Sequence, residues 1–132
     1  MPFSLGEALL IPHLNYTNPI QYLLSNQIEI KGMAHITGGG LLENIPRVLP
    51  LHCSVEIDRQ AYAVPSIFNI MREIGRLNDN EMYRTFNMGI GLVMIVAANQ
   101  VSGIQTVLKS YADFPLYHIG QVIEGQQKVV IN

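Results

Sequence analysis

The sequence of 132 residues has no tryptophan, a single cysteine and few charged side chains, which make up 14% of the residues. The lone cysteine, Cys53, cannot form an internal disulfide, which fits a reducing compartment. The eight lysine and arginine residues are scattered and leave no basic patch for nucleic acid. No apolar run approaches the ~20 residues that span a bilayer, and residues 1–10 lack the basic region and cleavage site of a signal peptide. We therefore expect a cytoplasmic protein with neither nucleic-acid nor membrane partners.

What the sequence has is a large hydrophobic fraction, 48% of the residues. A chain of this length and composition forms about one globular domain with one modest core, so we expect residues 1–132 to fold as a single domain. Hydrophobic periodicity and turn residues predict strands at 28–37, 53–58 and 90–97, and two more within 116–132 around a turn at Gly125. The same signals predict helices at 18–26, 41–49, 64–75, 78–87 and 99–111, after an extended stretch at 7–16.

Proline and glycine mark several of these boundaries. The clearest helix, 64–75, opens at Pro65, ends at Gly75 and has one apolar face made by Ile67, Ile70, Met71 and Ile74. Gly32 indicates a bulge or close approach in its strand. Pro46 is awkward inside 41–49: either the helix bends there, or its regular hydrogen bonding starts late, near Asn44.

The order of the elements predicts the fold class. Strands alternate with helices, and the economical arrangement is one sheet with helices packed on it. We therefore predict an α+β fold with a mixed β-sheet flanked by helices. The near-continuous apolar strand at 90–97 is expected to be covered on both faces.

The segment TGGGLLEN, residues 37–44, places three consecutive glycines between a predicted strand and a predicted helix. Glycines there cost backbone entropy with no evident gain in folding. Free amides at a helix start attract anions, so we expect phosphate against the N–H groups of Gly39 and Gly40. The pattern is neither a P-loop nor a dinucleotide fingerprint. A tight strand-to-helix turn without any ligand is an equally good interpretation.

His35 lies two residues before the glycines, and its side chain type suits proton transfer. A histidine on an apolar strand is more often a packed, hydrogen-bonded residue than a catalyst. The other histidines, at positions 13, 52 and 118, are dispersed in the sequence. No cluster has metal-ligand spacing, so we expect no metal site.

Two long blocks, GMAHITGGGLLENIPRVLP (32–50) and EMYRTFNMGIGLVMIV (81–96), resemble the C-terminal domain of the phosphoribosylformylglycinamidine cyclo-ligase family, also called aminoimidazole ribonucleotide synthetases. LGEALLIP and HIGQVIEG, which flank these blocks, are weaker echoes of the same family. The resemblance extends over essentially the whole chain.

This resemblance implies a ligase of purine biosynthesis that closes the ring of formylglycinamidine ribonucleotide with ATP and Mg²⁺. In such enzymes the amide oxygen is phosphorylated, and an internal nitrogen then attacks to form the imidazole. The N-terminal domain supplies most of the ATP and metal site, and the C-terminal α+β domain closes the cleft. We expect this chain alone to hold neither ATP nor Mg²⁺.

The resemblance also implies which residues contact the substrate. His35 and Asn44 are the candidate catalytic residues. The candidate phosphate- and substrate-binding residues are Thr37, Gly38, Gly39, Gly40, Arg47, Asn87 and Gly89. The last two belong to a loop, residues 86–91, that is expected to face the glycines; a bulged turn entering a strand is the plain alternative for that loop.

The sequence also departs from the family. It starts at Met1 just before LGEALL, so the ATP-binding domain is expected to be absent, and His13 stands where relatives have threonine. The chain is then an excised fragment, a truncated gene or half of a split enzyme, and we expect it to be inactive alone. We also expect it to associate with a separate N-terminal domain or with itself. A non-catalytic module that binds a phosphorylated metabolite is the alternative function.

Overall fold

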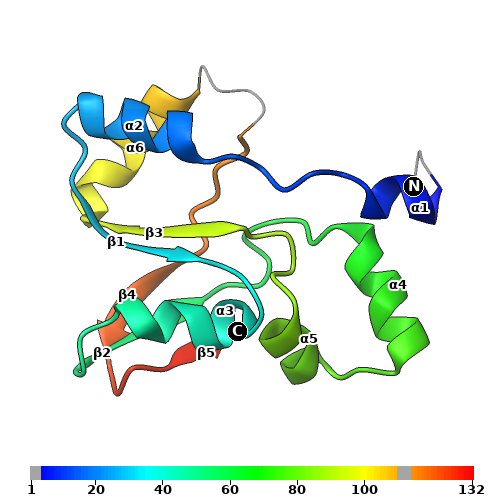
Figure 1. The fold of residues 1–132 in the computed structure, drawn as a ribbon. Coiled ribbons are helices and arrows are strands. Elements are labelled where there is room, and N and C mark those ends of the chain that lie inside the picture. Colours follow the sequence, from blue (N-terminus) through cyan, green and yellow to red (C-terminus); the bar gives the residue numbers. More distant parts are fainter. Residues whose placement is uncertain (1–3, 110–113) are drawn as a thin grey trace.

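The computed structural model describes residues 4–109 and 114–132 (Figure 1). Its α-helices are α1 (Leu5–Leu9), α2 (Thr17–Ser25), α3 (Gly40–Asn44), α4 (Ser66–Gly75), α5 (Asp79–Thr85) and α6 (Val101–Leu108). Its strands are β1 (Ile30–His35), β2 (Cys53–Ile57), β3 (Leu92–Val96), β4 (Gly120–Glu124) and β5 (Val129–Ile131). Two 3₁₀ turns, η1 (Ile45–Val48) and η2 (Ala98–Gln100), precede β2 and α6.

The strands form two sheets. β1 pairs with β3 antiparallel, and their register shifts between Ile30 and Gly32, which confirms the predicted bulge. β2 lies between β4, to which it is antiparallel, and β5, to which it is parallel. The α+β class and the mixed sheet are therefore confirmed. The expectation of one sheet is wrong, because β1 and β3 pair with each other and with no strand of the mixed sheet.

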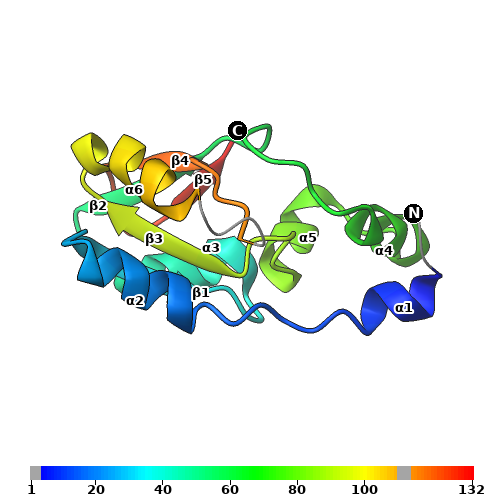
Figure 2. The same ribbon diagram turned by 90° about the horizontal axis from the view of Figure 1, so that it is seen from above.

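Packing occurs on both sides of the β1–β3 pair. On one side, helices α2 and α6 cover the pair and bury Leu23, Ile104 and Leu108, with Met94 packed against them. On the other side, the mixed sheet and α3 enclose the larger core, into which Ile95 packs (Figures 1 and 2). Strand β3 is thus contacted on both faces, as predicted, yet all five of its residues stay half-buried.

Local interactions explain where elements differ from their predicted bounds. The extended prediction for 7–16 is wrong at its start, because Ser4 and Glu7 form a reciprocal capping box that begins α1. Pro46 ends regular α-helical bonding rather than delaying it: α3 stops at Asn44 and the chain continues as η1. The predicted helices 64–75 and 78–87 are confirmed.

The remaining predicted elements agree with the structure within a few residues. The 18–26 helix starts at Thr17, and the 99–111 helix is η2 followed by α6, which ends at Leu108. Tyr111, predicted on that helix, lies outside the described residues. Among the described residues, no helix is both long enough and apolar enough to span a membrane.

Candidate functional site

The three glycines connect the end of β1 to the start of α3. Gly39 and Gly40 have left-handed backbone angles, with φ of 101° and 59°. A side chain on Gly40 would collide with the carbonyl oxygen of Tyr83 and would lie 2.7 Å from that of Phe86. The last turn of α5 therefore packs directly on the Gly40 backbone. The expectation that the glycines bring no gain in folding is wrong at this position, because the close approach they permit is to another part of the chain.

Asn44 holds this loop together from inside. The residue is 5% exposed, and its Nδ2 donates to the carbonyl oxygens of Gly40 (2.9 Å), Thr37 (3.2 Å) and Gly38 (3.3 Å). Its Oδ1 accepts from Arg47 Nη1 at 3.3 Å. Asn44 is thus turned into the protein, and its visible role is to satisfy loop carbonyls that the short helix leaves unpaired.

The same contacts limit how the loop can bind an anion. The Gly40 N–H already donates to the Thr37 carbonyl at 3.0 Å, so this amide is not available. A side chain on Gly39 would lie 3.0 Å from the Glu43 carboxylate, so a negative charge adjoins the loop. Arg84 Nε, 3.5 Å from Glu43 Oε1, offsets part of that charge. Thr37 and Gly38 remain exposed at the loop surface, and a side chain on Gly38 would meet nothing within 4 Å.

The 86–91 loop adjoins the end of β1. The Ile36 N–H donates to the Gly91 carbonyl at 2.9 Å, directly after His35. Within the loop, Asn87 Oδ1 accepts from the Gly89 N–H at 2.9 Å, which closes a turn. Gly89 has φ of 93°, and a side chain on it would lie 2.9 Å from Pro65 Cγ. The structure thus brings this loop beside β1 and the glycine loop, with Asn87 bonded to its own turn.

His35 has an unexpected partner. His13 Nε2 lies 3.0 Å from His35 Nε2, and the ring centroids are 5.1 Å apart. The Tyr16 ring packs edge-on against His13 at 5.6 Å, and burial raises the pKa of the Tyr16 phenol, which keeps it neutral. Sequence reasoning missed this pair and treated His13 as dispersed. The one signal was that His13 replaces the family's threonine in an extended segment.

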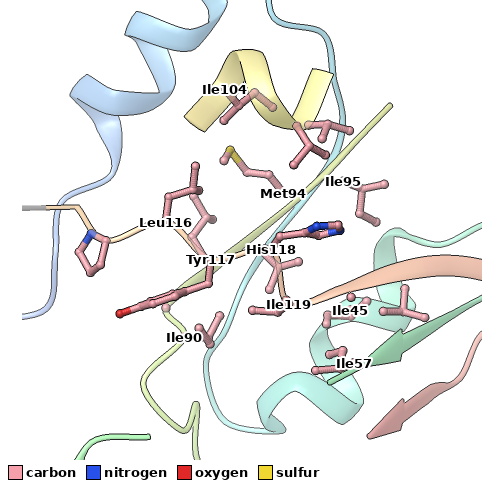
Figure 3. Close-up of a pocket in the computed structure, with 18 of the residues that line it drawn as sticks. Ile45, Ile57, Ile90, Met94, Ile95, Ile104, Leu116, Tyr117, His118 and Ile119 are labelled. Atoms are coloured by element: carbon pink, nitrogen blue, oxygen red, sulfur yellow. The ribbon is translucent and has the colours of Figure 1, made fainter. Parts of the chain in front are cut away.

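A large hollow lies elsewhere among the described residues. A groove of about 550 Å³ opens between β3, α6 and residues 114–122. Figure 3 shows its lining as mostly aliphatic, with Met94, Ile104, Leu116 and Ile119 around it and His118 beside Ile95. Of the candidate site residues, only Gly89 borders it. Within residues 4–109 and 114–132, no three histidine, cysteine or carboxylate side chains lie together as a metal site would need.

Comparison with known proteins gives one family. A family model described as "AIR synthase related protein, C-terminal domain" matches residues 3–132. The chain is 43% identical over 128 residues to the phosphoribosylformylglycinamidine cyclo-ligase of Pseudothermotoga lettingae and 46% identical over 127 residues to that of Crocosphaera subtropica. These matches cover 97% and 96% of this chain but 37% of each relative. The chain therefore spans little more than a third of their length.

The fold has solved counterparts. The hydrogenase maturation protein HypE of E. coli superposes with a TM-score of 0.63 at 24% identity, over 88% of this chain and 36% of that one. This likeness shows the shared α+β fold.

Proposed function

The chain belongs to the AIR synthase related protein family, whose C-terminal domain it matches, and on this premise we propose that it forms the C-terminal part of a phosphoribosylformylglycinamidine cyclo-ligase. The observation that carries the proposal is the identity above 40% to cyclo-ligases over almost the entire chain. The complete activity is ATP-dependent ring closure of formylglycinamidine ribonucleotide in purine biosynthesis. This activity then needs the N-terminal part of such an enzyme as well.

We assign substrate contact to the exposed groups at the end of β1. His35, paired with His13, offers ring nitrogens within reach of a ligand, and Thr37 adds a hydroxyl next to the open Gly38 backbone. This hydroxyl donates to Asn44 Oδ1 at 3.4 Å, and its oxygen can accept from a ligand. Arg47 is exposed and supplies positive charge nearby. Positioning of the reacting amide against the attacking nitrogen is the work expected of these groups.

The buried members of the predicted set have a different role in this proposal. Asn44 and Gly40 act as positioning residues that shape the loop, because their polar groups are used within the chain. Gly39 and Gly89 supply the left-handed turns that hold the two loops in place. Asn87 fixes the second turn through Gly89.

Mg²⁺ has no evident set of ligands on the described part of this chain. Magnesium is bound by several oxygen ligands, and the described residues contain no such carboxylate cluster. We therefore propose that nucleotide and metal are held by the N-terminal part of the enzyme, and that this chain alone neither hydrolyses ATP nor closes the imidazole ring.

A chimera tests this proposed function. The N-terminal part of the Pseudothermotoga lettingae cyclo-ligase, outside the matched region, is joined to this chain in a single polypeptide. We expect ADP release that depends on formylglycinamidine ribonucleotide from the chimera and none from the isolated chain. A folded chimera without turnover, under conditions where the intact Pseudothermotoga enzyme works, would overturn the proposal.

A further inference from the structure

Helix α4 is strongly amphipathic, yet it is only partly packed against the rest of the molecule. None of its ten residues, all of them described, is fully buried, and Ile74 is 77% exposed. Its apolar residues at 67, 70, 71 and 74 follow the spacing of a helix face that packs on a partner. Such a face normally provides the free energy that holds a helix of this length in place.

The side of α4 that contacts the rest of the molecule is a different one. Phe68 lies 6.1 Å, centroid to centroid, from Phe86, and Arg72 Nη1 donates to Asp79 Oδ1 of α5 at 2.7 Å. Phe68 and Arg72 are four residues apart and share a face, whereas Ile70 and Ile74 share another. The contacts to Phe86 and α5 therefore hold α4 by its Phe68–Arg72 face, and on the other face Ile70 is half-buried while Ile74 is exposed.

Helix α1 and the residues after it also have apolar side chains that are exposed. None of the five residues of α1, all within the described part of the chain, is buried. Leu5 and Leu9 are exposed, Leu10 is 82% exposed, and Ile11 is exposed as well. Both views show α1 and α4 near each other at the end of the molecule farthest from α2 and α6 (Figures 1 and 2). We call the exposed Leu5, Leu9, Leu10, Ile11 and Ile74, together with the half-buried Ile70, the α1–α4 surface.

We propose that the α1–α4 surface is the docking site for the N-terminal domain of an AIR synthase related protein. This inference rests on the proposed function. The family's matched region is its C-terminal domain, and 37% coverage leaves 63% (100 − 37) of each relative outside it. In such a relative the preceding domain joins the chain next to α1, at the same end as the exposed aliphatic side chains. An apolar surface of this kind on a soluble chain marks an interaction site.

The occupant has a defined chemistry. The α1–α4 surface consists of aliphatic side chains, so the partner contributes a matching aliphatic patch rather than a charged one. Arg72 and Arg59 are paired with Asp79, whereas Glu73 and Arg76, at the end of α4, are exposed. A second copy of this chain is the competing occupant, and it is distinguished by experiment.

The test uses the full chain and the separately expressed N-terminal part of the Pseudothermotoga lettingae cyclo-ligase, checked for folding by circular dichroism. The variant combines Leu10→Glu with Ile74→Glu, two side chains exposed enough to spare the fold. The matched control is Leu51→Glu, because Leu51 is 80% exposed and lies in the turn before β2, away from the surface. Affinity is measured by calorimetry, and self-association by sedimentation velocity.

We expect the double variant to lose about tenfold or more in affinity for the N-terminal part, while Leu51→Glu binds as the unaltered chain does. Equal binding by the double variant would overturn the docking site and leave the proposed function intact, since the chimera reports activity independently. If the unaltered chain self-associates, the double variant does not, and the N-terminal part does not bind, then the surface binds a second copy of this chain. That result would refute the N-terminal domain as the partner. Absence of binding by the unaltered chain also overturns the inference, and the chimera's turnover then decides whether the proposed function falls with it.

Discussion

Gly38, Gly39 and Gly40 follow one another in the sequence but have three different surroundings. Gly38 faces open space, Gly39 adopts a left-handed turn beside Glu43, and Gly40 is pressed against the carbonyl oxygens at the end of α5. A run of glycines indicates that side chains are excluded at these positions. It does not indicate whether a ligand or the protein's own backbone occupies the space. That distinction required the position of α5, which is set by residues forty positions away.

Substitution separates these roles. Gly40→Ala is expected to lower the free energy of unfolding by about 3 kcal/mol or more, because the added methyl collides with backbone and φ is positive. Gly38→Ala, its matched control, is expected to stay within about 0.5 kcal/mol of the unaltered chain. Urea unfolding measures both. Equal effects of the two substitutions would contradict the assigned packing.

Asn44 gives a second residue-scale prediction. Asn44→Ala removes the donor to three loop carbonyls and is expected to cost about 2 kcal/mol of unfolding free energy. Asn44→Asp, similar in size but without the amide donor, is expected to destabilise as well. If Asn44 served only to contact a ligand, both variants would unfold at the same urea concentration as the unaltered chain.

The buried hydroxyl of Tyr62 lowers the stability of the fold. It is 7% exposed, and its hydroxyl has no hydrogen-bond partner among the described residues. Tyr62→Phe is therefore expected to raise the unfolding free energy by about 1 kcal/mol. Burial, with a smaller contribution from Tyr83, raises the pKa of the Tyr62 phenol above its ordinary 10.0.

The raised pKa of Tyr62 determines whether the free energy of unfolding rises or falls with pH. Above pH 10.0 the unfolded-state phenol ionises while the folded state keeps it neutral, so the fold loses stability as the pH rises from 10.0 toward the raised pKa. The advantage of Tyr62→Phe should therefore widen at alkaline pH in urea unfolding. A constant difference from neutral to alkaline pH would show that Tyr62 does not titrate as its burial requires.

At the scale of elements, local signals predicted what local interactions decide. Helix α5 begins at Asn78, whose side chain accepts from the Glu81 N–H as the sequence pattern indicates. Helix α4 begins directly after Pro65 and its last residue is Gly75, as predicted, but the left-handed residue that caps its end is Arg76. The missed element is α1, which overlaps the stretch predicted to be extended at 7–16 and begins with the capping box of Ser4 and Glu7. A five-residue helix gives too short a period to detect.

The cap of α1 is sensitive to acid. The Ser4 backbone N–H and hydroxyl donate to the Glu7 carboxylate, and these hydrogen bonds, the backbone one first, lower the pKa of Glu7 below its ordinary 4.5. Its contribution is present above the unfolded-state pKa and is lost as pH falls through the lowered one. Amide NMR shifts of residues 4–7 are expected to move as the pH falls below 4.5 through this lowered pKa. Glu7→Gln should lack this transition, and an identical titration in the variant would refute the cap.

At the scale of the whole molecule, the sequence predicted the α+β class but not how the strands divide. The alternating order is equally consistent with one sheet or two, because pairing depends on contacts between distant segments such as Val55 with Val129. The His13–His35 pair has the same origin: two residues 22 positions apart meet only because the segment before α2 passes the end of β1. For the candidate site, the sequence predicted the two loops. Which of the candidate residues in these loops face outward depends on three-dimensional contacts that the sequence did not reveal.

Two deletions probe this organisation. Removing residues 128–132 deletes β5, which pairs with β2 and packs Val129 and Ile131 against the larger core. We expect the melting temperature to fall by about 10 °C or more. Removing residues 1–9 deletes α1, which buries nothing, and should leave the melting temperature nearly unchanged. Thermal circular dichroism compares them; equal losses would contradict the unequal contributions of β5 and α1.

The position of β2 between β4 and β5 has a consequence for how the protein is made. Ser54 on β2 accepts a hydrogen bond from the Lys128 N–H, which is added to the growing chain 74 residues later. At ordinary rates of translation that interval lasts roughly 4–15 s. Until β4 and β5 have been made, the edges of β2 are available to any other unpaired strand or to a chaperone. The nascent chain is therefore most vulnerable to aggregation at Cys53–Ile57, a segment that in the finished protein lies at the centre of a sheet.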